Sequence, residues 1–269
     1  MARDNFKDKN RFESKKRDIT EENPNMIIGR NAVSEALANN RPIDCVFTSK
    51  GEKNGSLGRI IAECKEKNIV IKEVDSKKLD TMCDGGNHQG VICFAAAHEY
   101  ASVDDMFDLA KSRNEEPFII ILDELEDPRN LGAIVRTAET AGAHGVIIPK
   151  RRSASLSFSV AKTAAGALEY VPVARVANLP GTIDELKKRG LWIYGADMDG
   201  TTWCQQDYKG PVGLVIGSEG NGIGRLVKEK CDFIVSLPMK GKITSLNASV
   251  AAGVLMYEVS RQRAEIKAK

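Results

Sequence analysis

The sequence contains the stretch Ser236-Leu-Pro-Met-Lys-Gly-Lys-Ile-Thr-Ser-Leu-Asn-Ala-Ser-Val-Ala251. It joins the end of a short apolar strand to a Gly/Lys loop and then to a helix start made of small residues. Ser245, Asn247 and Ser249 place hydroxyl and amide groups where the first turn of a helix has N–H groups without partners. A turn of this kind can bind a polar ligand, although a well-capped helix explains it equally well on its own.

Two further segments favour the ligand-binding interpretation over a simple helix cap. They are Leu122-Asp-Glu-Leu-Glu-Asp-Pro-Arg-Asn-Leu-Gly-Ala-Ile-Val-Arg136 and Gly213-Leu-Val-Ile-Gly-Ser-Glu-Gly-Asn-Gly-Ile-Gly-Arg225. In order, spacing and local context, the three segments resemble the signature motifs of the SpoU (TrmH-like) family of SPOUT RNA 2′-O-ribose methyltransferases. The resemblance covers roughly residues 117–262.

The resemblance implies an α/β fold with a parallel-sheet methyltransferase domain whose C-terminal part, around residues 236–262, forms a trefoil knot. Composition cannot indicate a knot, and knots are very rare. Residues 26–97 resemble the small substrate-binding domain that precedes many family members, through Gly29-Arg-Asn-Ala-Val-Ser-Glu-Ala-Leu37 and His88-Gln-Gly90. This two-part layout is similar to the bacterial 23S rRNA (guanosine-2′-O)-methyltransferases.

The length of 269 residues suits two modest domains. Residues 1–24 are charged and poor in apolar side chains, which predicts a disordered tail. We expect an RNA substrate-binding domain over 26–97, a linker with a short helix over 98–116, and the methyltransferase domain over 117–269.

Local patterns predict the elements of both domains. In the first, we expect helices at 30–39, 56–67 and 76–82 and strands at 43–48, 69–73 and 90–96. In the second, apolar runs typical of buried parallel strands occupy 118–122, 145–148, 171–173, 191–194, 212–216 and 233–235, with helices at 129–142, 157–166, 180–189, 222–229 and 245–264.

Two of these helices show further local patterns. In the helix at 180–189, Thr182-Ile-Asp-Glu185 is typical of a capping box. Leu246, Val250 and Val254 form an apolar stripe on the last helix, which the core alone could use.

Composition excludes several classes of protein. No run approaches the ~18 apolar residues of a membrane span, and no apolar signal region is present, so we expect a cytoplasmic protein. The cysteines at 45, 64, 83, 93, 204 and 231 lack C-x-x-C spacing and read as buried small hydrophobes. The histidines at 88, 98 and 144 show no metal-ligand spacing, and we expect no metal.

A net charge of +2 does not by itself indicate a nucleic-acid partner. Basic clusters occur at Lys15–Arg17, Lys150–Arg152, Lys187–Arg189 and Lys240/Lys242. We interpret Lys187–Arg189 as a solvated helix face. Lys150, Arg151 and Arg152 follow an expected strand at the edge of the site, so they are our candidates for RNA contact.

The glycine-rich run Gly217–Gly224 lacks both G-x-G-x-x-G spacing and a Gly-Lys-Ser/Thr ending, which makes a dinucleotide oxidoreductase a weak rival. The glycines offer close backbone approach and positive φ beyond a strand end. The resemblance implies S-adenosylmethionine as cofactor, and we assign its contacts to Gly217, Leu237 and Leu246. Ordinary core packing is the alternative for both leucines.

Methylation of a ribose hydroxyl requires that the hydroxyl lose its proton and be aligned with the methyl group. The resemblance implies that Arg136 is catalytic. Because a guanidinium holds its proton beyond pH ~12, we expect Arg136 to act as a clamp and electrostatic stabiliser, with the proton passing to phosphate or water. The other expected catalytic residues are Asn130, Glu219, Ser245 and Asn247. Without the motifs, Asn130 would be interpreted as a helix cap and Glu219 as a solvated loop carboxylate. Ser245 and Asn247 would be interpreted as parts of a well-capped helix.

The resemblance also implies a homodimer that uses the last helix. Among RNAs, large-subunit ribosomal RNA is the expected substrate and transfer RNA is the alternative. A noncatalytic RNA-binding protein with a degenerate methyltransferase domain is a further alternative, which the intact set of polar positions disfavours.

Overall fold

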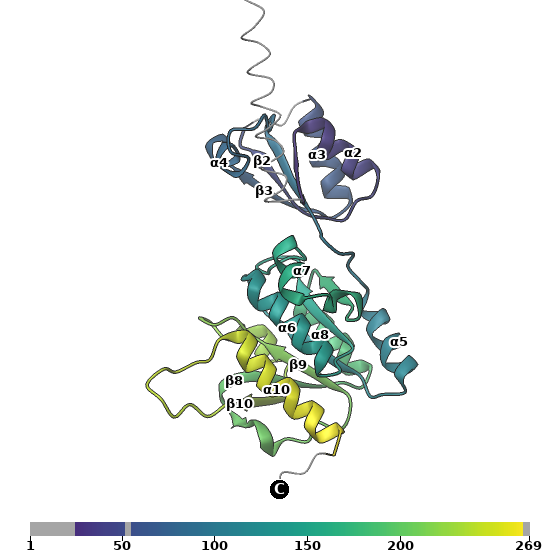
Figure 1. Cartoon of the computed structure of the whole chain (residues 1–269), viewed down its shortest axis with the longest axis vertical. Coiled ribbons are helices and arrows are strands. Elements are labelled where there is room, and N and C mark those ends of the chain that lie inside the picture. The colour runs from purple at the N-terminus through teal and green to yellow at the C-terminus, as the bar shows by residue number, and fades with distance from the viewer. Residues whose placement is uncertain (1–24, 52–54, 266–269) are drawn as a thin grey trace, which may run out of the picture. The chain divides into compact units, whose positions relative to one another are not determined.

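The computed structural model describes residues 25–51 and 55–265, and these form two compact units (Figure 1). The first consists mainly of residues before Tyr100, and the second mainly of residues from Tyr100 onward. The expected disordered tail, residues 1–24, lies outside the described part of the chain.

The first unit is a mixed sheet with strand order β1-β4-β2-β3. Its elements are β1 (Met26–Ile28), α2 (Arg30–Ala38), β2 (Ile43–Ser49), α3 (Gly55–Glu66), β3 (Val70–Val74), α4 (Ser76–Met82) and β4 (Val91–Ala95). β4 runs antiparallel to β1 and β2, whereas β2 and β3 are parallel. Alternate residues of β4 serve separate cores, because Val91 and Cys93 pack with side chains of α2 and α3 while Ile92 packs with Leu79 of α4. The sequence pattern did not predict β1, because its three residues are too few to show the alternation of apolar and polar side chains in a strand.

The second unit is a parallel sheet with strand order β10-β8-β9-β5-β6-β7. Its strands are β5 (Phe118–Leu122), β6 (Gly145–Pro149), β7 (Val173–Val176), β8 (Trp192–Thr202), β9 (Val212–Ile216) and β10 (Phe233–Ser236). Its helices are α5 (Val103–Arg113), α6 (Pro128–Thr140), α7 (Phe158–Ala164), α8 (Leu179–Lys188), α9 (Arg225–Lys228) and α10 (Ala248–Arg263), with short 3-10 turns at Ala167–Glu169 and Trp203–Gln205. The parallel α/β architecture confirms the predicted fold class, and the trefoil knot stays a prediction.

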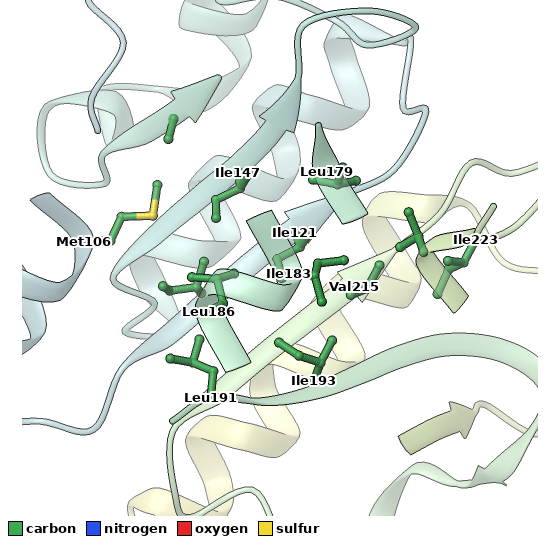
Figure 2. Close-up of a cluster of buried hydrophobic side chains, with 13 residues drawn as sticks. Met106, Ile121, Ile147, Leu179, Ile183, Leu186, Leu191, Ile193, Val215 and Ile223 are labelled. Atoms are coloured by element: carbon green, nitrogen blue, oxygen red, sulfur yellow. The ribbon is translucent and has the colours of Figure 1, made fainter. Parts of the chain in front are cut away.

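A hydrophobic core of mainly aliphatic side chains from strands and helices covers one face of this sheet (Figure 2). Ile121 and Val215 of neighbouring strands meet Ile183 and Leu186 of α8. Met106 of α5 joins the same cluster and is fully buried. Helix α5, which lies in the segment predicted as a linker, therefore belongs to the packed core of the second unit.

The last helix differs from its prediction in a way that matters for function. It begins at Ala248, so Leu246 precedes it, and Val250 and Val254 are 51% and 40% exposed. The buried face is formed instead by Ala252, Leu255, Met256 and Val259. α10 carries apolar residues on both faces, and the stripe found in the sequence is the face that the core does not use.

Three other expectations are wrong. Thr182 lies inside α8, whose N-cap is Asn178, because the Asn178 side chain accepts the Gly181 N–H. The cluster Lys187–Arg189 is not merely solvated, since Lys187 pairs with Asp232 at 2.6 Å and Arg189 pairs with Asp104 at 2.7 Å. Cys204 is exposed.

Some elements have different bounds from those expected. β7 begins at Val173 rather than 171, α9 is a single turn, and β8 extends to Thr202, well past its apolar run. No helix in the described ranges is long and apolar enough to span a bilayer. The same residues contain no cluster of three or more His, Cys, Asp or Glu suited to a metal ion.

Candidate active site

Three loops meet at one edge of the parallel sheet, where β5, β9 and β10 end. In open parallel sheets, ligands bind beyond the carboxyl ends of the strands. The loop after β5 leads into α6, whose N-cap is Asp127: its carboxylate accepts the Arg129 N–H at 2.8 Å. Asp127 thus takes the capping role considered for Asn130. Asn130 instead lies in the first turn of α6, 5% exposed.

Asn130, Glu219 and Asn247 form a closed hydrogen-bonded network. The Asn130 Nδ2 donates to Glu219 Oε1 at 2.8 Å, and the Asn247 Nδ2 donates to the same oxygen at 2.5 Å and to Asn130 Oδ1 at 3.0 Å. The Ala248 N–H also donates to Glu219 Oε1, at 3.3 Å. One residue comes from each sequence motif, and the network fixes the three loops to one another.

Asn247 links this network to the fold of the last helix. Its Oδ1 accepts the N–H groups of Ser249 and Val250 at 3.0 and 3.3 Å, which makes it the N-cap of α10. The Ser249 hydroxyl donates to the same oxygen at 2.6 Å. Because Oδ1 is committed to the cap, the amide nitrogen has to face Asn130 and Glu219. The capping explanation of this stretch therefore holds, and the same side chain also joins the network with Asn130 and Glu219. Its catalytic role stays a prediction.

The glycine-rich loop after β9 is a tight turn. Ser218 and Gly222 exchange backbone hydrogen bonds of 3.0 and 2.9 Å. A Cβ on Gly217 would stand 2.1 Å from the Gly222 backbone, so only glycine fits at position 217. Beyond the turn, the Gly224 N–H donates to the carboxylate of Asp123 at 2.8 Å. Burial raises the pKa of Asp123.

An apolar cavity of about 240 Å³ opens beside this turn. We refer to it as the apolar cavity; its walls are the turn Gly217–Gly222 and side chains of β8, the loop after β10 and α10. Its apolar side chains are Met198, Ile216, Val235, Leu237, Met239, Leu246 and Leu255, and its polar ones include Asp197, Glu219, Thr244 and Ser245. Five of the predicted site residues therefore line one cavity: Gly217, Glu219, Leu237, Ser245 and Leu246. Leu237 is half-buried and Leu246 is 38% exposed, which is not the burial of ordinary core residues.

Arg136 does not join the network. Six residues after Asn130 on α6, it begins about 120° away around the helix axis and ~9 Å along it. Its side chain is exposed and makes no hydrogen bond or ion pair with any described residue. The next residue, Thr137, approaches Gly253 of α10 with its methyl group, so α6 packs against α10 at this level.

The basic residues after β6 lie in a loop outside the apolar cavity. Lys150 is half-buried, and Arg151 and Arg152 are exposed. The Arg152 guanidinium pairs with Glu124 at 2.8 Å, which raises the pKa of Arg152. Their role in RNA binding remains a prediction.

Sequence reasoning missed two acidic residues of the site. Asp123 holds the glycine loop, and Asp197 lines the apolar cavity while pairing with Lys228 at 2.9 Å. Asp123 was detectable, since it is a carboxylate directly after a buried apolar strand. Asp197 gave no such signal, because β8 continues without an apolar pattern.

Substitution of Gly217 by alanine is expected to abolish ligand binding in the apolar cavity. The added methyl group would collide with the Gly222 backbone, so the turn must open and distort the cavity wall. Calorimetric titration of S-adenosylmethionine measures the effect. Gly210→Ala is the control, because a Cβ there meets nothing within 4 Å. Equal affinity in both variants would contradict the assignment of Gly217.

Comparison with known proteins shows the family to which the chain belongs. Residues 117–257 match the model of the SpoU rRNA methylase family, and residues 26–101 match the model for RNA 2′-O ribose methyltransferase substrate binding. The chain belongs to the SpoU rRNA methylase family. It is thus an RNA methyltransferase with an N-terminal substrate-binding domain, as its motifs predicted.

Individual relatives agree with the SpoU assignment. The chain is 52% identical to YacO of Bacillus subtilis (strain 168), named as a TrmH family tRNA/rRNA methyltransferase, over 88% of this chain and 95% of that protein. A protein of the same description from Staphylococcus haemolyticus is 45% identical over 90% of this chain and 97% of its own length.

Solved structures share the fold. An AdoMet-bound rRNA methyltransferase from Sinorhizobium meliloti has a TM-score of 0.54 and 25% identity, covering 90% of this chain and 88% of that one. The SpoU methyltransferase AviRb from Streptomyces viridochromogenes, in complex with AdoMet, has a TM-score of 0.57 and 23% identity over 89% and 90%.

Proposed function

We propose that this SpoU-family chain methylates a ribose 2′-oxygen, and that its substrate is a guanosine of 23S ribosomal RNA in the cytoplasm. The observation that carries the 2′-O assignment is the Asn130–Glu219–Asn247 network, whose Glu219 lines the apolar cavity. It offers a carboxylate and amides, which orient a hydroxyl, without any nucleophilic thiol or amine. The two-domain layout, with a substrate-binding domain before the methylase domain, supports a large structured RNA as substrate.

The methyl donor is S-adenosylmethionine, and the residues of the apolar cavity fit it. Leu237 and Leu246 give an apolar wall for the adenine ring, and the Gly217 turn exposes backbone groups at close range. When bound, the cofactor supplies an electrophilic methyl group and leaves as a neutral thioether. No residue of the chain therefore has to protonate a leaving group.

The remaining chemistry concerns the ribose hydroxyl. Glu219 Oε1 is held by three donors, while Oε2 has no hydrogen bond among the described residues. Oε2 can accept the hydroxyl proton in a hydrogen bond and aim the oxygen lone pair at the methyl group. Because α6 turns Arg136 away from Glu219 of its own chain, we propose that Arg136 of a second copy of the chain stabilises the negative charge that develops on the oxygen. The proton held at Glu219 Oε2 passes on to a phosphate oxygen or water. Ser245 contacts the substrate from the cavity wall.

The exposed position of Arg136 is consistent with a homodimer across α10. Val250, Val254 and Tyr257 are 51%, 40% and 52% exposed and lie on one face of that helix at spacings of four and three. A second copy that covers this face would bury these three side chains, and α6, which carries the exposed Arg136, packs against the same helix. Light scattering at working concentration should give the mass of a dimer. A fully active monomer would refute the dimer.

Mapping of ribose methylation tests the substrate. In a strain without the gene, one 2′-O-methylguanosine of 23S ribosomal RNA should disappear and should return on complementation with the wild-type gene. Loss of a mark in transfer RNA alone would replace the ribosomal assignment with the transfer RNA alternative. Loss of a methyl group from a base would overturn the 2′-O assignment.

A further inference from the structure

A second cavity lies on the other side of the glycine turn. It measures about 360 Å³ and is polar, and we refer to it as the polar cavity. It is lined by the loop Glu124–Asp127, Asn130 and the turn residues Ser218–Asn221. Ser218–Asn221 also line the apolar cavity, so this turn is a shared wall. Glu219 stands in that wall and Asn130 holds it by a hydrogen bond.

This arrangement satisfies a geometric requirement of methyl transfer. The reacting oxygen and methyl carbon must approach to about 3–3.5 Å, so the substrate site has to adjoin the cofactor site. The polar cavity adjoins the apolar one, and the catalytic network stands between them. We propose that the polar cavity receives the target nucleotide of the RNA, and that Glu126 reads its base as guanine. This inference rests on the proposed function.

Within the loop Glu124–Asp127, Glu126 is the acidic residue whose carboxylate remains available to a ligand. The Glu124 carboxylate pairs with Arg152, and the Asp127 carboxylate caps α6. Glu126 is exposed, and its carboxylate makes no hydrogen bond or ion pair with any described residue. Its carboxylate lines the polar cavity without a hydrogen-bond partner among the described residues, and its charge acts on the nearby Arg152 guanidinium.

The negative charge of Glu126 restricts which part of an RNA can bind beside it. A free carboxylate repels RNA phosphates, so it is favourable beside RNA only where it meets hydrogen-bond donors of a base. The Watson–Crick edge of guanine presents two adjacent donors, N1–H and the 2-amino group, which match the two oxygens of a carboxylate. Uracil presents one donor between two carbonyl groups, and adenine and cytosine place an unprotonated nitrogen beside their amino group. Guanine is therefore the base that Glu126 fits.

The wall that carries Glu126 is held in an unusual backbone conformation. Glu124 and Arg152 both have left-handed φ values, 52° and 54°, although neither is glycine. Such conformations are unfavourable for residues with a side chain and persist where surrounding contacts impose them. The ion pair between the two residues connects the loops after β5 and β6.

The test is a cycle that combines one side-chain change with one base change. The full-length protein is assayed on an RNA fragment containing the mapped target, synthesised with guanosine or with inosine, which lacks the 2-amino group. We expect Glu126→Ala to lower kcat/KM on the guanosine RNA roughly tenfold, and inosine to lower it roughly tenfold for the wild type. Inosine should have no further effect on Glu126→Ala. The affinity for S-adenosylmethionine should not change in either case.

Glu185→Ala is the matched control, because Glu185 is exposed on α8 and its side chain makes no hydrogen bond or ion pair with the described residues. It should behave as the wild type on both RNAs. If Glu126→Ala also matches the wild type, or discriminates between guanosine and inosine as strongly, the base-reading role is wrong while the proposed function stands. If the mapped target is not a guanosine, the inference is likewise overturned. If the wild type methylates no RNA, the proposed function itself fails.

Discussion

Replacement of Arg136 by alanine should reduce the rate of methyl transfer by at least ~10²–10³-fold, which is the usual loss when one group that stabilises developing charge is removed. The same variant should fold normally and bind S-adenosylmethionine with nearly wild-type affinity. Arg136 is exposed, has no described partner and does not line the apolar cavity, so the fold and the cofactor site lose nothing with it. Single-turnover kinetics with saturating RNA measures the first effect, and calorimetry the second.

Two comparisons make the Arg136 result specific. Arg136→Lys keeps the charge but loses the planar set of five donors, and we expect it to recover only a small part of the rate. Arg225→Ala removes an arginine of the same unit that pairs with Glu229 on the surface of α9, and it should leave the rate unchanged. An active Arg136→Ala enzyme would show that the residue is an ordinary surface arginine.

The fold was predictable where the pattern was strong. Phe118–Leu122 and Val212–Ile216 are continuous apolar runs, and both are buried parallel strands at those bounds. β8 was predicted only as far as residue 194, because its later residues are polar and are held by pairing with β10 rather than by a buried face. On α10 the sequence shows which residues are apolar, but not which of two apolar faces the core will use.

The candidate site was predictable through the motifs and not through its geometry. The resemblance placed Asn130, Glu219 and Asn247 in one site, and the structure brings them within hydrogen-bonding distance. The same resemblance grouped Arg136 with them, whereas helical geometry turns its side chain toward another surface. The polar cavity could not be predicted, since it depends on the path of the loop Glu124–Asp127 relative to the turn after β9.

Asn247 is both the N-cap of α10 and a member of the network with Asn130 and Glu219, and one substitution separates these two sets of contacts. Asn247→Asp keeps an oxygen for the N–H groups of Ser249 and Val250, so the cap of α10 survives. It replaces the donor nitrogen by a carboxylate oxygen beside Glu219 Oε1 and Asn130 Oδ1. We therefore expect methyl transfer to be nearly lost at pH 8, together with a destabilisation of about 1–3 kcal/mol from two carboxylates in contact.

The effect of Asn247→Asp should depend on pH with a definite sign. Two adjacent carboxylates raise the pKa at which the pair binds a proton above the ~3.9 of an unfolded aspartate. The folded state then holds a proton that the unfolded chain has released, so stability falls as pH rises from about 4 through the raised pKa. Urea unfolding at pH 5 and pH 8 should show the deficit mainly at pH 8. Asn178→Asp, the same change at the N-cap of α8, keeps the hydrogen bond from the Gly181 N–H and should show no such deficit. If the two variants unfold alike at pH 8, the Asn247 amide does not hold Glu219, and the network is not what fixes the turn after β9.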